Sequence, residues 1–160
     1  MDILQKSKNN QRRIGLTGGI ASGKTTITNY IRKYKNIPIL DADNLSRELI
    51  KPNTYGYKKI LDYFGNTIID HKNNSERTIN RKLLMNIIFK NSENKVLIEK
   101  LLHPLIKEKL IEECSQYKNN ETIVLVIALL FEAKFEDICT EIWLVKCPKE
   151  IQKKKAHHER

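Results

Sequence analysis

The sequence contains little that would place the protein outside the cell or in a membrane. Its three cysteines (Cys114, Cys139 and Cys147) form no C-x-x-C pair, and their odd number argues against a disulfide framework. No apolar run approaches the roughly 18 residues that a membrane-spanning helix needs, and residues 1–10 lack the apolar core of a secretion signal. We therefore expect a reduced, cytoplasmic protein without membrane partners, in which each cysteine is a small buried or half-buried apolar side chain.

The sequence also lacks a basic block interleaved with aromatic residues, although its net charge is +10 over 160 residues. Such a charge suits a nucleic-acid surface, and it suits equally a small polyanion such as a nucleotide or a phosphorylated cofactor. The positive residues are spread along the chain, so charge alone does not choose between these partners. The length and the 40% apolar content are those of one globular domain with a real core.

The most specific motif is residues 18–25, which fit the pattern G-x-x-x-x-G-K-[ST]. A short strand predicted at 14–17 precedes it and a helix predicted at 25–34 follows, which is the context of a phosphate-binding loop. Glycines let the backbone wrap around a phosphate, and the helix start adds free N–H groups. Lys24 supplies a charge for the β- and γ-phosphates, and Thr25 supplies a hydroxyl for Mg²⁺. The predicted nucleotide-binding residues are Gly18, Gly19, Ile20, Ala21, Ser22, Gly23, Lys24, Thr25 and Thr26. The alternative is a glycine-rich turn without a ligand.

Two acidic residues follow the next predicted strand. Residues 36–40 form that strand, which runs into Asp41 and Asp43. A strand after one helix makes a βαβ unit with parallel strands, whose carboxyl ends share one edge of the sheet. We therefore expect both acids on a strand beside the phosphate loop, where the pair could orient an acceptor hydroxyl and a metal ion, and a carboxylate near the acceptor can take its proton. The alternative is a polar loop that caps the following helix.

The strongest predicted strand, residues 122–127, is apolar throughout and leads to Glu132, before a last strand at 142–146. An acid after such a strand can hold the Mg²⁺ shell in a phosphate-loop protein, or it can be an ordinary exposed loop acid. Between the acidic pair and this strand the sequence predicts only helices. We expect them at 44–51, 54–64, 80–89, 93–102 and 103–117, with Pro52 as a break, Gly65 as a stop and Ser92 as an N-cap.

These elements predict an α/β fold: a parallel sheet flanked by helices, with a helical substrate-binding insertion. We expect one domain of residues 1–160, with its core at 13–43 and 121–160 and the insertion at 44–118. A short helix at 135–140 and a further helix from 149 onward complete the prediction. Within the insertion, Arg81 and His103 are candidate binding residues, although an arginine there is commonly solvated and a histidine before proline is commonly structural.

Together the motifs resemble the dephospho-CoA kinase family, whose members have a P-loop kinase fold. The phosphate loop alone is shared by many kinases, but the combination of motifs is much more specific. The resemblance extends from about residue 13 to about residue 152. The segments that carry the resemblance are Leu-Thr-Gly-Gly-Ile-Ala-Ser-Gly-Lys-Thr at 16–25, Asp-Ala-Asp at 41–43, Ile-Asn-Arg at 79–81 with Ile-Phe at 88–89, His-Pro-Leu-Ile at 103–106, and Leu-Leu-Phe-Glu at 129–132.

The resemblance implies ATP-dependent phosphorylation of the ribose 3′-hydroxyl of dephospho-CoA, which yields coenzyme A. Asp43 would be the general base, and Asp41 would support it or the metal. Lys24 and Thr25 would hold the ATP phosphates and Mg²⁺.

The resemblance also assigns the acceptor side. Arg81, His103 and Glu132 would bind dephospho-CoA, with the helical insertion as the CoA-binding part. We expect a monomer that acts on this small molecule and not on nucleic acid.

The sequence departs from the family in two places. Ala128 stands where the family usually has proline, and residues 153–160 lack the arginine spacing of the family's lid helix. We therefore expect the C-terminal lid and an edge strand to be missing, which would lower activity because lid arginines stabilise the transferring phosphoryl group. The alternatives are a nucleotide-binding fragment with impaired catalysis and, less favoured, a basic P-loop protein that acts on nucleic acid.

Overall fold

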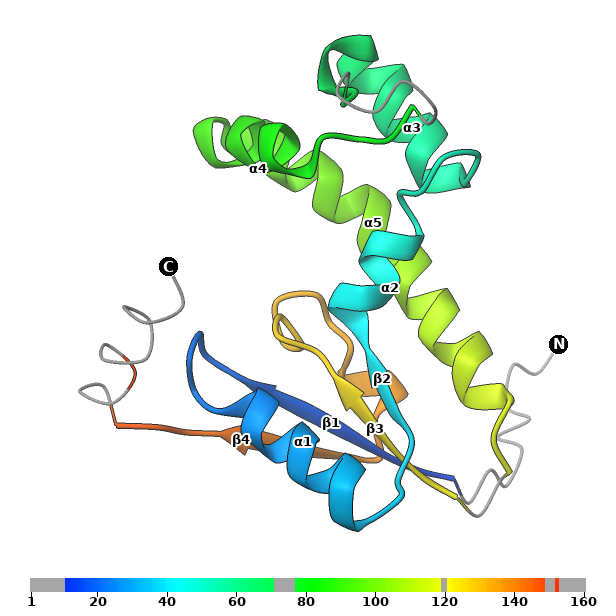
Figure 1. Cartoon of the computed structure of the whole chain (residues 1–160), viewed down its shortest axis with the longest axis vertical. Helices are drawn as coiled ribbons and strands as arrows, with labels where there is room; N and C mark the ends of the chain where they lie inside the picture. Colours follow the sequence, from blue (N-terminus) through cyan, green and yellow to red (C-terminus); the bar gives the residue numbers. More distant parts are fainter. Residues whose placement is uncertain (1–10, 71–76, 119–120, 149–151, 153–160) are drawn as a thin grey trace, which may run out of the picture. The chain divides into compact units, whose positions relative to one another are not determined.

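The structure is a computed structural model that describes residues 11–70, 77–118, 121–148 and 152 (Figure 1). The chain divides into two compact units. The sheet unit comprises Met1–Ala42 and Leu110–Arg160, and the helical unit comprises Asp43–Lys109. None of the helices in these described ranges is both long and apolar enough to cross a membrane.

Within the described residues, the sheet unit is built on four parallel strands. Their order is β2-β3-β1-β4, and β1 pairs with both β3 and β4. The parallel sheet confirms the predicted α/β fold, but β3 lies between β1 and β2. The prediction that the acidic pair follows a strand that neighbours β1 is therefore wrong, although β2 ends at the same edge of the sheet as β1. The elements of this unit are β1 (Arg12–Gly18), α1 (Lys24–Tyr34), β2 (Ile39–Asp41), β3 (Thr122–Val126), the 3-10 helix η2 (Glu136–Ile138) and β4 (Glu141–Val145).

The central strands are buried because helices or loops cover both faces of a parallel sheet. Ile14 and Leu16 of β1 and Val124 of β3 are almost fully buried and form one core with Ile31 of α1. Figure 1 shows α1 lying across the sheet next to β1. This core holds the end of β1, and thus the start of the phosphate loop, in a fixed position.

The second strand is shorter than predicted and begins later. The prediction placed it at 36–40, but Asn36 has a left-handed backbone (φ 47°) and Pro38 has no N–H to donate. Pairing starts with the Pro38 carbonyl, which accepts a hydrogen bond from the Val124 N–H at 2.9 Å. The helix α2 (Ala42–Glu48) follows at once, so Asp43 lies in a first helical turn and not in a loop.

The helical unit has its own apolar core. Ile60 of α3 and Ile68 of η1 are fully buried, and Leu84 of α4 and Ile98 of α5 pack with them. Thr54 caps α3 by accepting a hydrogen bond from the Tyr57 N–H at 3.2 Å. The elements of the helical unit are α2 from Asp43 onward, α3 (Tyr55–Phe64), η1 (Gly65–Ile68), α4 (Arg81–Lys90) and most of α5 (Ser92–Ser115).

The structure corrects the predicted helix boundaries around Pro104. The chain forms one 24-residue helix, α5, with Pro104 inside it, where the prediction had two helices. Proline removes one backbone hydrogen bond from a helix, yet the buried side chains of Ile98, Ile106 and Leu110 continue along the same helix on both sides of it. Packing therefore outweighs the lost bond. The predicted cap at Ser92 is also wrong, because the Asn91 side chain accepts the Glu93 N–H bond at 2.8 Å.

The last predicted elements are only partly described. The helix predicted at 135–140 is the single 3-10 turn η2. Gln152 is helical, but the rest of the helix predicted from residue 149, including the lid region at 153–160, lies outside the described residues. In the described part of the chain, β4 pairs only with β1 and lies at one edge of the sheet.

Candidate active site

The phosphate loop starts where β1 ends, and its first glycine is required by close packing. Gly18 has φ 152°, and a Cβ built on it would lie 2.5 Å from the Val145 carbonyl oxygen of β4 and 2.8 Å from Ser22 Oγ. Any larger residue would push apart the strands that support the loop.

The loop turns through two left-handed residues. Ala21 has φ 56° and Gly23 has φ 104°, and the Ser22 N–H donates to the Gly19 carbonyl at 3.2 Å. Gly23 precedes α1 without any side-chain cap, and the first turn of α1 contains no acidic residue. The N–H groups at the start of α1 therefore create a region of positive potential that no carboxylate of that turn neutralises.

Lys24 lies over the loop that it follows. Its Nζ donates hydrogen bonds to the Gly18 carbonyl at 2.6 Å and to the Gly19 carbonyl at 3.0 Å. Thr25 is exposed, whereas Ser22 is buried and its Oγ has no hydrogen-bond partner among the residues that the structure describes. A buried hydroxyl without a partner is costly, and a phosphate oxygen in the loop would supply one. The loop thus fits a phosphate group.

A cavity of about 280 Å³ opens beside the first half of the loop. Lys24 and Glu132 are the two ionisable side chains in its lining, and Thr17 Oγ1 donates to the Ala128 carbonyl at 3.2 Å, which ties the end of β1 to the turn after β3. The residues that line the cavity are Thr17, Gly18, Gly19, Ile20, Lys24, Ala128, Leu129, Phe131, Glu132 and Leu144.

The cavity includes side chains that the sequence did not identify as site residues. Leu129 and Phe131 belong to the Leu-Leu-Phe-Glu motif, and their position beside a predicted acid was a signal that pointed to them. Leu144 carried no signal, because it is one apolar residue of an apolar strand. Its place in the cavity follows only from the pairing of β4 with β1.

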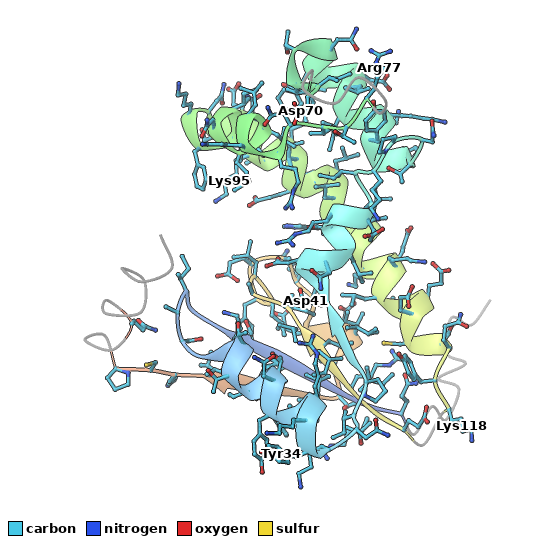
Figure 2. All side chains as sticks on the ribbon, viewed as in Figure 1. Tyr34, Asp41, Asp70, Arg77, Lys95 and Lys118 are labelled. Atoms are coloured by element: carbon cyan, nitrogen blue, oxygen red, sulfur yellow. The ribbon has the colours of Figure 1, made fainter. Side chains whose placement is uncertain are left out.

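Asp41, which is labelled in Figure 2, is the last residue of β2 and lies at the carboxyl edge of the sheet. It is level with Val126 of β3, which in turn is level with Leu16 of β1. Two strand spacings separate Asp41 from β1, or about 10 Å. Asp41 is thus at the same edge of the sheet as the loop, but it does not line the cavity.

Three predicted site residues belong to the helical unit. Asp43 is exposed in the first turn of α2, Arg81 is the exposed first residue of α4, and His103 is half-buried in α5. The described structure therefore gathers the phosphate loop, Lys24 and Glu132 around one cavity, while Asp43, Arg81 and His103 are positioned by the helical unit.

Burial lowers the pKa of His103 below 6.5, and the negative charge of Glu99 opposes this shift less strongly. The folded chain therefore binds a proton at His103 less readily than the unfolded chain. We expect the free energy of unfolding to be constant with respect to this group above pH 6.5, and to fall as the pH decreases from 6.5 through the folded pKa. Urea unfolding at pH 7.5 and at pH 5 measures this effect. The free energy of unfolding should fall less between these pH values for His103→Gln than for the unaltered chain, and an equal fall would contradict the prediction.

The oxygen donors present suit magnesium. Among the described residues no group of three or more His, Cys, Asp or Glu side chains could hold a metal ion. Mg²⁺ does not need such a group, because it is usually held by one or two protein oxygens together with phosphates and water. The Thr25 hydroxyl and the Asp41 carboxylate are donors of this type.

Comparisons with known proteins agree with one another. The family model for dephospho-CoA kinase matches residues 12–159. A dephospho-CoA kinase of Prochlorococcus marinus (strain MIT 9312) is 85% identical over 155 residues, which cover 97% of this chain and 76% of that protein.

Solved structures show the same fold. A Thermus thermophilus protein of known crystal structure is 26% identical with a TM-score of 0.77, and the alignment covers 92% of this chain and 72% of that one. A dephospho-CoA kinase from Campylobacter jejuni is 27% identical with a TM-score of 0.62, covering 82% and 65% of the two chains.

Proposed function

The chain belongs to the dephospho-CoA kinase family, and from this premise we propose that it transfers the terminal phosphate of ATP to the ribose 3′-hydroxyl of dephospho-CoA, which yields coenzyme A and ADP. The observation that carries the proposal is the cavity in which the phosphate loop, Lys24 and the acid of the Leu-Leu-Phe-Glu motif meet. The sheet and its flanking helices are those of a P-loop kinase.

The loop binds and orients the donor. Its backbone N–H groups and the start of α1 hold the phosphates of ATP, and the Lys24 ammonium exchanges its bonds to the Gly18 and Gly19 carbonyls for phosphate oxygens. Ser22 Oγ gains a partner in the same step. Thr25 and Asp41 would hold Mg²⁺, which neutralises charge on the phosphates when it is bound.

Asp43 takes the proton from the acceptor. As the 3′-oxygen bonds to the γ-phosphorus, the bond from that phosphorus to the β–γ bridging oxygen breaks and ADP leaves. The proton of the 3′-hydroxyl passes to the Asp43 carboxylate, and Asp41 supports this residue or the metal.

Residues of the helical unit hold the rest of the acceptor. Arg81 and His103 would contact dephospho-CoA, whose pyrophosphate suits a protein with a net charge of +10. We further propose a monomer that acts in the cytoplasm on this small molecule.

A coupled assay for ADP tests the function. We expect ADP release to require both ATP and dephospho-CoA, with coenzyme A as the product. ATP binding without ADP release would instead support a catalytically impaired nucleotide-binding chain. Stimulation of ADP release by RNA or DNA, without dephospho-CoA, would support action on nucleic acid.

A further inference from the structure

One wall of the cavity beside the phosphate loop is apolar and exposed. Leu129, Phe131 and Leu144 line it, and each is about half exposed, at 48%, 50% and 52%. Apolar side chains grouped at a cavity that also contains charged groups are typical of a ligand site. Nothing in the donor's phosphate chain accounts for them.

The turn that carries Leu129 and Phe131 is anchored by buried neighbours, and Leu144 is held by the pairing of β4 with β1. Leu130 and Phe135 are almost fully buried, and the Phe135 N–H donates to the Leu130 carbonyl at 2.9 Å. Because Leu130 points into the core, its neighbours Leu129 and Phe131 remain at the surface. The wall is therefore held in place before any ligand arrives.

The cavity lies at the terminal-phosphate end of the loop. Its lining includes Gly18, Gly19 and the Lys24 side chain, but neither Thr25 nor Thr26 of the first turn of α1. In a phosphate loop the lysine reaches the β- and γ-phosphates. A group that occupies the cavity is therefore next to the phosphate that is transferred, on the acceptor side of it.

The charge of Glu132 also indicates that the cavity holds part of the acceptor and not a phosphate of the donor. Its carboxylate would repel a phosphate in the cavity, whereas it readily accepts hydrogen bonds from a hydroxyl or an amino group. A cavity with an apolar wall and one acceptor carboxylate suits a nucleoside, which has an aromatic base together with ribose hydroxyls.

We propose that Leu129, Phe131 and Leu144 bind the adenosine part of the phosphate acceptor, with Glu132 accepting a hydrogen bond from it. This rests on the proposed function. The reacting 3′-oxygen must come within about 3–3.5 Å of the phosphorus, and the ribose that carries this oxygen also carries the base. The pantetheine arm is separated from that ribose by a pyrophosphate. A cavity of about 280 Å³ is at the small end of ligand sites, which measure roughly 300–1,000 Å³, and it holds only one part of the acceptor.

Calorimetric titration of dephospho-CoA into the chain saturated with a non-hydrolysable ATP analogue tests the proposal. We expect Phe131→Ala to weaken binding of dephospho-CoA about tenfold, since stacking on an aromatic side chain contributes strongly to base binding. We expect Leu129→Ala to weaken it by a similar factor, because the variant loses apolar surface that the base would cover. The affinity for the ATP analogue should stay within twofold. Phe131→Tyr, which keeps the ring, should bind dephospho-CoA like the unaltered chain.

Tyr34→Ala is the matched control, because Tyr34 is an exposed aromatic residue of the same unit outside the cavity. It should leave both affinities unchanged, and thermal unfolding checks that every variant is folded. Weaker binding of the ATP analogue by Phe131→Ala would assign the wall to the donor and overturn the proposal, as would unchanged affinity for both ligands. Pantetheine is then added as a competitor of dephospho-CoA. If it competes for binding to the unaltered chain but not to Phe131→Ala, the apolar wall binds the pantetheine arm, which would also overturn the proposal. If the unaltered chain does not bind dephospho-CoA, the proposed function fails as well.

Discussion

Replacing Lys24 by alanine should lower kcat/KM for phosphate transfer about 10²- to 10³-fold, which is the usual loss when one group that stabilises developing charge is removed. Lys24 is the single basic side chain in the lining of the cavity, and its Nζ already lies against the loop carbonyls at 2.6 and 3.0 Å. The steady-state rate of ADP release with dephospho-CoA measures the effect.

Two further variants make this result specific. Lys24→Met keeps the aliphatic part of the side chain and should lose the same activity, which separates loss of charge from loss of packing. Lys33→Ala removes an exposed lysine from the last turn of α1, far along the helix from the loop, and should retain full activity. Undiminished turnover in Lys24→Ala would refute the assignment of residues 18–25 as the donor site.

The second large effect is expected at Asp43. Asp43→Asn should reduce kcat about 10²- to 10⁴-fold, the range of general base catalysis, while KM for ATP changes little. The amide has nearly the same shape as the carboxylate but cannot take the proton of the 3′-hydroxyl at neutral pH. Single-turnover phosphate transfer to dephospho-CoA measures the chemical step directly.

Asp43 also lies in the first turn of α2, where a negative charge stabilises the helix by about 0.3–1 kcal/mol. Thermal unfolding of Asp43→Asn therefore has to accompany the kinetics. Asp62→Asn, an exposed acid of α3, serves as the control and should be fully active. Full activity in Asp43→Asn with a loss in Asp41→Asn would transfer the role of base to Asp41.

Local sequence was sufficient to predict the phosphate loop. Its function depends on consecutive residues: Gly18 has to be small because Val145 and Ser22 crowd it, and Lys24 follows the loop at a fixed distance along the chain. The backbone was predicted less well. Ala21, which is not a glycine, has the left-handed conformation at φ 56°, because the turn from Gly19 to Ser22 requires it there.

Helix boundaries depended on packing that the sequence expresses only weakly. Gly65 was correctly predicted to end α3, since its φ of 70° is readily reached only by glycine. Pro104 was wrongly predicted to begin a new helix. A proline signal is local, whereas the burial of Ile98 and Leu110 on either side of it is a property of the folded units.

The sequence by itself therefore determined that this protein has a parallel sheet and a phosphate-binding loop between β1 and α1. It also determined that one acid ends β2 and another lies in the turn after β3. These features follow from motifs of neighbouring residues. Only the tertiary structure decided that β3 separates β1 from β2, which sets Asp41 two strands from the loop. It also decided that Leu129, Phe131 and Leu144 meet at one cavity. Strand order and cavity walls arise from contacts between segments far apart in the sequence, such as the pairing of Leu16 in β1 with Val126 in β3 and with Trp143 in β4, which no local pattern specifies.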